Sequence, residues 1–208
     1  MPARNRINHL VTESIPRIIL ASGSRYRAEL LERVQSGVLS SPTEVDETPI
    51  SGELPRDTAV RLARAKACAG AETHLDSLVI GSDQVADLDG QPLGKPGTFQ
   101  RAHAQLADCS DKTVLFHTAV CVADNRGGAS VLREGVDTTR VVFRKLQAAE
   151  ISRYLLHDSP LDCAGSFKME QLGVSLFERV ESEDPTAIIG LPLIVLCRLL
   201  RQCGLIIP

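Results

Sequence analysis

Short apolar runs alternate with amphipathic segments along most of the chain, which predicts strands followed by helices. The run Ile18–Ala21 is typical of a buried strand, and the helical spacing of the apolar residues after it predicts a helix over 26–34. Pro55 begins a second predicted helix, because proline is favoured in the first helical turn. Leu78–Gly81 is another short run of the buried-strand type.

The second half of the chain predicts hairpins as well as helices. Asp89-Gly90 is a strong hairpin-turn signal, and the cluster Asp124-Asn-Arg-Gly-Gly128 lies between two segments rich in β-branched residues. The remaining predicted elements are a helix over 98–107 capped by Thr98, strands over 113–122 and 131–143, a helix over 147–156, and a helix over 192–202 that Pro192 begins and Gly204 ends. Together these elements predict an α/β fold in which a mixed central β-sheet is flanked by helices.

The length and hydrophobicity of the chain suit one domain. With 208 residues, of which 43% are hydrophobic, residues 18–208 are expected to form a single core. Residues 1–17 carry several charges without a sustained apolar run, so they are predicted to be a flexible N-terminal extension and not a secretory signal. No apolar run approaches the length of a membrane-spanning helix.

Composition argues against several classes of function. A net charge of −3 and an aromatic content of 3% do not suit a nucleic-acid-binding face. The six cysteines are scattered without a C-x-x-C pair, which predicts reduced, buried thiols in a cytoplasmic protein. The five histidines show no short ligand spacing, so any metal is expected to be magnesium or manganese held by carboxylates.

The turn after the first strand is a candidate phosphate site. Ser22 and Ser24 supply hydroxyl donors, and Arg25 and Arg27 supply planar guanidinium groups suited to phosphate oxygens. These residues precede a predicted helix, whose N-terminal N–H groups and dipole attract anions. The same small polar residues also suit an ordinary capping turn.

The predicted second helix places a lysine on its buried side. Lys66 follows the apolar stripe of this helix at helical spacing, so its stem leaves from the face that packs on the core. It either covers apolar surface with its stem or directs its ammonium into a site. Arg61 and Arg64 lie away from the centre of the stripe and are expected to be solvated.

Two groups of carboxylates are candidates for metal binding and acid–base chemistry. Asp83 follows a buried run, at the end of a strand where α/β sheets bind ligands, although a turn or cap explains it equally well. The predicted hairpin returns Lys95 beside Asp83, unless this lysine is an ordinary exposed loop residue. Glu44-Val-Asp-Glu47 is a solvated acidic loop or a source of metal ligands opposite the phosphate turn.

An ordered series of motifs resembles the Maf family of nucleotide pyrophosphatases over Ile18 to about Arg201. The motifs are Leu20-Ala-Ser-x-Ser24 with Arg27, Val45-Asp-Glu47, Arg61-Leu-Ala-x-x-Lys66-Ala67, Gly81-Ser-Asp83, Gly94-Lys-Pro96, Ala164-Gly165 and Gly190-Leu-Pro192. The resemblance implies a Maf/ITPase-like fold with a cleft between two lobes, and often a homodimer. One departure is Arg25, which stands where the family usually has a proline that would pre-set the helix start.

The resemblance also implies an activity. Such enzymes hydrolyse a nucleoside triphosphate between its α and β phosphates, with a divalent cation, Mg²⁺ or Mn²⁺. Asp83 would be the general base, and Glu47 with Asp83 would associate with the metal. Lys66 and Lys95 would assist catalysis by neutralising phosphate charge, and the residues that would hold the phosphates are Ser22, Ser24 and Arg27.

Two further segments resemble the branch of the family associated with 7-methyl-GTP. They are Ser82-Asp-Gln84 and Cys163-Ala-Gly-Ser-Phe-Lys-x-Glu170; the branch acting on dTTP and UTP has threonine after the aspartate and glutamine where Glu170 stands. A methylated guanine is cationic, so Tyr26 can stack on it, Glu170 can accept from its N–H edge, and Gln84 can reach a base edge. The alternatives are a dTTP/UTP-type pyrophosphatase and a nucleotide-binding regulator of septum formation.

Overall fold

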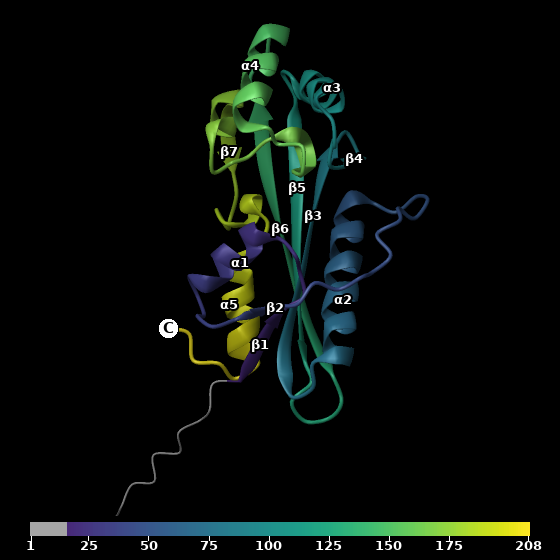
Figure 1. The fold of residues 1–208 in the computed structure, drawn as a ribbon, viewed down its shortest axis with the longest axis vertical. Helices are drawn as coiled ribbons and strands as arrows, with labels where there is room; N and C mark the ends of the chain where they lie inside the picture. The colour runs from purple at the N-terminus through teal and green to yellow at the C-terminus, as the bar shows by residue number, and fades with distance from the viewer. Residues whose placement is uncertain (1–15) are drawn as a thin grey trace, which may run out of the picture.

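The computed structural model describes residues 16–208, whose elements alternate along the chain (Figure 1). The strands are β1 (Arg17–Leu20), β2 (Leu39–Ser40), β3 (Ser77–Leu88), β4 (Gln91–Leu93), β5 (Thr113–Asp124), β6 (Val131–Phe143) and β7 (Phe177–Glu181). The helices are α1 (Arg25–Glu32), α2 (Pro55–Thr73), α3 (Phe99–Cys109), α4 (Ala148–Asp158) and α5 (Leu193–Gln202), with short 3-10 turns η1 (Ala164–Ser166), η2 (Leu172–Leu176) and η3 (Ala187–Ile189). The predicted mixed sheet flanked by helices is confirmed.

The sheet has seven strands in the order β2-β1-β3-β5-β6-β7, with β4 paired to β3. Strand β1 runs parallel to β2 and β3, and the other pairs are antiparallel. On the β1 side, β3 pairs with β1 up to Ile80 and with β4 from Ala86 onward. The stretch between them, Gly81 to Val85, therefore has a free edge beside the point where the chain leaves β1.

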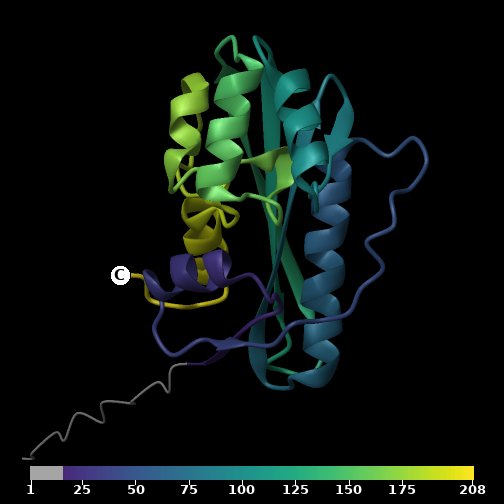
Figure 2. The same ribbon diagram turned by 45° about the horizontal axis from the view of Figure 1, so that its top comes forward.

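Helices cover both faces of the sheet. Figure 2 shows α2 on one side and α1, α4 and α5 on the other. The alanine-rich stripe of α2 packs on β3 and β5, whereas the opposite face carries two apolar clusters. One cluster gathers side chains from α3 and α4, and the other gathers side chains from α1 and α5.

Small residues bring α2 close to β3. A Cβ on Gly81 would collide with the Ala63 carbonyl oxygen and the Ala67 nitrogen of α2, so only glycine permits this approach. The side chain of Lys66 leaves α2 between these two contacts and is buried. The close approach therefore directs its ammonium toward the free edge of β3.

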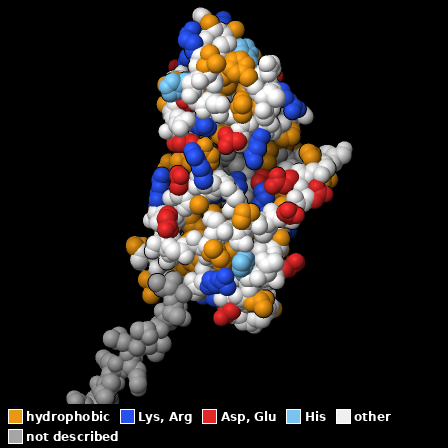
Figure 3. All heavy atoms as spheres, viewed as in Figure 1, with side chains coloured by type: hydrophobic (Ala, Val, Ile, Leu, Met, Phe, Trp, Pro, Cys, Tyr) orange, Lys and Arg blue, Asp and Glu red, His pale blue; other side chains and the backbone are white. Residues whose placement is uncertain are grey.

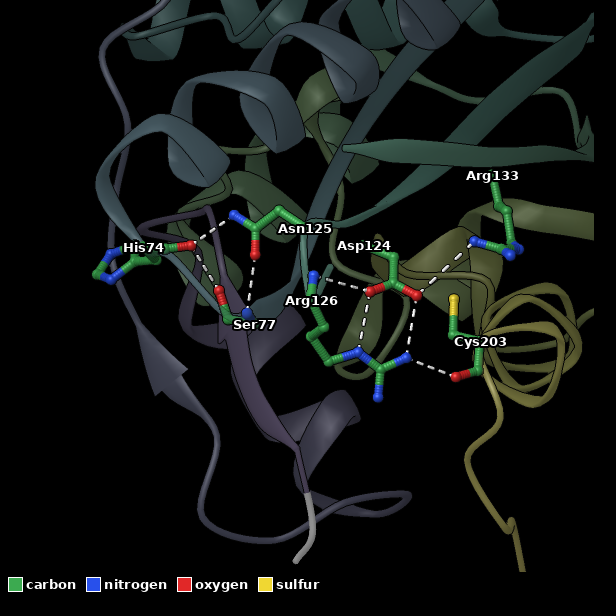
Figure 4. A network of polar contacts seen from close by, with 7 residues as sticks. All are labelled: His74, Ser77, Asp124, Asn125, Arg126, Arg133 and Cys203. Atoms are coloured by element: carbon green, nitrogen blue, oxygen red, sulfur yellow. Dashed lines mark hydrogen bonds and ion pairs between the residues drawn. The ribbon is translucent and has the colours of Figure 1, made fainter. Parts of the chain in front are cut away.

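Polar contacts around the loop after β5 join the start of β3 and the residue that follows α5 (Figure 4). Asn125, in the hairpin loop predicted after β5, accepts from the Ser77 backbone N–H at 2.8 Å. Asp124 binds the Arg126 guanidinium through both oxygens at 2.9 Å, and Arg126 donates to the Cys203 carbonyl at 2.6 Å. The loop thereby ties the start of β3 and the end of α5 to the sheet.

The observed boundaries differ from the predicted ones mainly at β3. The prediction of a strand over 78–81 was too short, since β3 continues to Leu88. Polar Asp83 and Gln84 interrupt its apolar run, but pairing with β5 keeps the chain extended. The predicted N-terminal extension lies outside the described residues apart from its last two, and Arg17 already belongs to β1. No helix in residues 16–208 is long and apolar enough to cross a membrane.

Candidate active site

A cavity of about 490 Å³ opens beside the free edge of β3. Its volume lies within the range of small-molecule sites, roughly 300 to 1,000 Å³. Ile189 lines the cavity and packs against both apolar clusters of this face, so the cavity lies between them. Charged side chains gather around a hollow at mid-height of the molecule (Figure 3). The predicted site residues in its wall are Ser22, Ser24, Tyr26, Arg27, Glu47, Lys66, Gln84, Lys95 and Glu170.

The turn predicted to bind phosphate lies at the start of α1. Ser24 is the N-cap, and its side chain accepts from the Arg27 backbone N–H at 3.4 Å. Ser22 Oγ accepts from the Ser24 N–H at 3.2 Å and from Arg27 Nη1 at 3.3 Å. Because both contacts use the oxygen as acceptor, the Ser22 proton remains free to donate to an anion.

Arg27 is anchored from the other end of the chain. Its Nε donates to the Gly190 carbonyl oxygen at 2.8 Å. Burial lowers the pKa of Arg27, and the nearby charges of Asp83 and Glu47 oppose that shift. An arginine remains charged at neutral pH even so, and this one faces the cavity as a fixed cation.

Lys66 joins the two carboxylates predicted to serve catalysis. Its Nζ lies 2.7 Å from Asp83 Oδ1 and 2.7 Å from Glu47 Oε1. The Lys66 and Asp83 side chains are 9% and 12% exposed, whereas that of Glu47 is 58% exposed. Hydrogen bonding from Lys66 lowers the pKa of Glu47, and Lys95 and Arg27 add to that effect.

Asp83 keeps one oxygen available. Its Oδ1 accepts from Lys66, while Oδ2 makes no hydrogen bond to a described residue. Asp83 lies behind Lys66 and is not part of the cavity wall itself. A water placed between Oδ2 and a bound phosphate would therefore donate a hydrogen bond to this carboxylate, beside the positive charge of Lys66.

The predicted hairpin of β3 and β4 forms, and it brings Lys95 to the cavity wall. Asp89 and Gly90 adopt positive φ in the turn, and Ala86 pairs with Leu93. Lys95 then lines the cavity wall, and its charge helps to lower the pKa of Glu47. The lysine thus acts on the acidic side of the site, where the carboxylate that it influences is Glu47.

The cavity wall also carries the residues predicted to recognise a base, Tyr26, Gln84 and Glu170. Tyr26 lies beside Cys163, Asp162 and Glu170, and burial together with these negative groups raises the pKa of its phenol. The Arg25 guanidinium carbon stands 5.1 Å from the Tyr26 ring centroid. Arg25, which replaces the family's proline, thus makes a cation–π contact with one face of this ring.

Hydrogen bonds within the protein hold the side-chain amide of Gln84 in place. Its Nε2 donates to Thr118 Oγ1 at 2.9 Å and to the carbonyls of Ala187 at 2.9 Å and Ile188 at 3.2 Å. The amide nitrogen therefore holds β3 to η3. Only the amide oxygen is left for a ligand in the cavity.

The prediction that Arg61 and Arg64 are merely solvated was wrong. Arg61 binds both oxygens of Glu53, at 2.7 and 2.8 Å. Arg64 binds both oxygens of Glu134, at 2.6 Å each. Each guanidinium finds a carboxylate on a neighbouring segment, which the helical pattern alone does not reveal.

Sequence reasoning did not assign three groups that the structure places at the cavity. Gly190 supplies the carbonyl that anchors Arg27, a role that the Gly190-Leu-Pro192 motif did not indicate. Lys168 lines the cavity and donates to the Asp158 carbonyl at 2.8 Å. Thr43 also lines it, and its buried hydroxyl has no hydrogen-bond partner among the described residues. Gly190 and Lys168 stand within motifs of the family resemblance, whereas no local signal distinguishes Thr43 from an ordinary loop position.

The carboxylates fit a hard cation that also binds phosphate. Within residues 16–208, no three His, Cys, Asp or Glu side chains gather as a complete metal site. Glu47 and Asp83 nevertheless converge on one point, now marked by Lys66 Nζ. Mg²⁺ commonly uses one or two carboxylates together with substrate phosphates and water, so two converging carboxylates suit it.

Comparisons with known proteins agree with this arrangement. The family model described as Maf-like protein matches residues 17–203. A protein of Xanthomonas oryzae pv. oryzae named 7-methyl-GTP pyrophosphatase is 54% identical over 93% of this chain and 100% of its own length. A Burkholderia thailandensis protein of the same name is 52% identical over 92% of this chain and 89% of its own.

A solved structure also shows a weaker likeness. The Ham1 protein of Staphylococcus aureus aligns with 76% of this chain and 89% of its own, at 16% identity and a TM-score of 0.42, too low to carry an argument. The family match and the two relatives, by contrast, span nearly the whole described chain. The chain belongs to the Maf family.

Proposed function

We propose that this protein hydrolyses 7-methyl-GTP between the α and β phosphates, releasing 7-methyl-GMP and diphosphate. The observation that carries the proposal is the contact of Lys66 with both Asp83 and Glu47 beside the phosphate-type turn. The names of the relatives support the choice of 7-methyl-GTP as substrate.

The cations of the cavity would hold the triphosphate. Arg27 and Lys95 face the cavity together with the Ser22 hydroxyl, whose proton is free to donate. Fixed donors and charges stabilise the negative charge that develops on phosphate oxygens, and such positioning supplies most of the catalysis in phosphoryl transfer. Arg27 is already held by Gly190, so little reorganisation is needed when a nucleotide binds.

Asp83 would activate the attacking water. Its Oδ2 would accept the proton of a water that lies in line with the scissile bond. Lys66 would hold the carboxylate in place through Oδ1 and neutralise phosphate charge on its cavity side. One buried lysine would thereby orient the base and bind the substrate.

A divalent cation, Mg²⁺ or Mn²⁺, would be held by Glu47 and Asp83. When bound, it would neutralise phosphate charge and polarise the scissile phosphoanhydride. The point on which the two carboxylates converge is now occupied by Lys66 Nζ, which lies 2.7 Å from an oxygen of each.

Tyr26, Glu170 and Gln84 would recognise the base. The 7-methylguanine ring is cationic, so it would stack on Tyr26 more strongly than guanine does. Glu170 would accept from the N1–H and N2 amino groups while offsetting the positive charge. Gln84 would contribute its amide oxygen, because its nitrogen is already bonded.

A substrate panel tests the proposal directly. Purified protein is incubated with Mg²⁺ and 7-methyl-GTP, GTP, dTTP or UTP, and the products are separated by chromatography. We expect 7-methyl-GMP and diphosphate to form fastest. Faster cleavage of dTTP or UTP would point to the other branch of the family, and tight nucleotide binding without turnover would favour a regulator.

The cellular compartment and the oligomeric state are also part of the proposal. All six cysteines are free, which suits a reducing compartment such as the cytoplasm. A homodimer remains a prediction from the family resemblance. A gel-filtration measurement with light scattering gives the mass in solution.

A further inference from the structure

Gln105 lies on α3, behind the cavity wall, and bonds two loops that form that wall. Its Nε2 donates to the Gly94 carbonyl oxygen at 3.1 Å. Its Oε1 accepts a hydrogen bond from Ser166 Oγ. A single side-chain amide therefore joins the loop after β4 to η1, which packs beside α3 (Figure 2).

The two loops contribute different residues to the cavity wall. Gly94 immediately precedes Lys95, which lines the phosphate side. Ser166 lies in the segment that supplies Cys163 and Glu170 to the base side. A backbone hydrogen bond from the Gly97 N–H to the Leu161 carbonyl, at 3.0 Å, joins the same two loops a second time.

Ser166 needs the contact that Gln105 provides. It is fully buried and adopts a positive φ of 62°, a conformation that costs a non-glycine residue energy. Without the Gln105 oxygen its buried hydroxyl would lose its acceptor, which carries a desolvation penalty. The Gln105 amide therefore helps to hold the buried part of the base-side segment.

We propose that Gln105 is a positioning residue, which sets Lys95 and the Cys163–Glu170 segment at the separation that one nucleotide requires. The inference rests on the proposed function, because the two ends of the cavity matter together only for a ligand with both a triphosphate and a base. Only a carboxamide supplies the donor that Gly94 needs and the acceptor that Ser166 needs. Glutamine also provides the reach from α3 to both.

A double-mutant cycle with Lys95 tests the proposal. Gln105→Leu removes both hydrogen bonds and keeps similar bulk. Gln100→Leu, at an exposed position of the same helix, is the control. We expect Gln105→Leu to lower kcat/KM for 7-methyl-GTP about tenfold, since small misplacements of charged groups cost rate, and the control to change it less than about twofold.

The decisive measurement repeats Gln105→Leu in the Lys95→Ala background. If Gln105 acts through Lys95, its removal there should cost less than about threefold, because coupled residues are not additive. A tenfold loss in both backgrounds, accompanied by a lower Tm, would show a merely structural role and overturn the proposal.

A second variant keeps the test valid if Gln105→Leu does not fold. Gln105→Glu retains the acceptor for Ser166 and loses the donor to Gly94, so its loss of kcat/KM should disappear in the Lys95→Ala background. Equal losses in the two backgrounds contradict the proposal. If the unaltered protein cleaves no nucleoside triphosphate, the proposed function fails. The same four proteins are then compared by their Kd for 7-methyl-GTP. Equal effects of Gln105→Leu on Kd with and without Lys95 would overturn the positioning role.

Discussion

The two ends of the cavity are built differently. At the phosphate end, Arg27 and Lys66 extend from helices, and both are held by hydrogen bonds to partners far away in the sequence. At the base end, Glu170 is exposed and lies on an irregular segment between η1 and η2. Of the three proposed base contacts, only Glu170 lies on a loop that can vary without disturbing the sheet, whereas Tyr26 on α1 and Gln84 on β3 belong to regular elements, as Arg27 and Lys66 do.

The largest effect should come from the phosphate end, at Asp83. Asp83→Asn keeps the shape of the side chain but removes the base, so turnover of 7-methyl-GTP should fall about 10²- to 10⁴-fold while nucleotide binding persists. Steady-state kinetics and calorimetric binding measure the two properties separately. Asp108→Asn, exposed on α3, is the matched control. Activity within threefold of the parent would exclude Asp83 as the base.

The next largest effect should distinguish cations that line the cavity from cations of α2 that lie outside it. Lys66→Ala and Lys95→Ala should each lower kcat/KM by about 10²-fold, since each removes a cation beside the developing phosphate charge. Arg61→Ala and Arg64→Ala should stay within about threefold, because those side chains bind Glu53 and Glu134 and lie outside the cavity wall. Melting curves confirm that each variant is folded. Equal losses in all four would contradict the distinction between cations that line the cavity and those that lie outside it.

At the base end a smaller and more selective loss is expected. Glu170→Gln retains the size of the side chain and removes its charge, so it should lower the preference for 7-methyl-GTP over GTP about tenfold, near the lower limit for a charge-assisted contact because Glu170 is exposed. The ratio of the two kcat/KM values is the measurement. An equal loss on both substrates would place Glu170 outside base recognition.

The smallest expected change comes from Tyr26. Tyr26→Leu removes the ring that would stack on the cationic base, and a cation–π contact at a partly exposed site is worth only about 0.5 to 1 kcal/mol, or two- to fivefold in preference. The ratio of kcat/KM for 7-methyl-GTP to kcat/KM for GTP measures this change in preference. A larger loss on GTP than on 7-methyl-GTP would contradict the stacking role.

Local signals determined much of what the sequence predicted. The Thr98 cap, the Asp89-Gly90 turn and the first residue of α2 at Pro55 were predicted in place, because caps, turns and first helical residues depend on a few neighbouring residues. Helical spacing likewise placed Lys66 on the buried side of α2. The turn before α1 was therefore predicted from the chain alone, and its binding of phosphate stays a prediction.

Tertiary structure decided the contacts that make these residues a site. Arg27 meets the Gly190 carbonyl 163 positions away, and Arg64 meets Glu134 across 70 positions. Strand β3 extends through Asp83 only because β5 pairs with it along that whole stretch. Such partners depend on how helices and strands pack, and no periodicity within a single element specifies them. The sequence by itself determined which groups are available, and packing determined which of them meet.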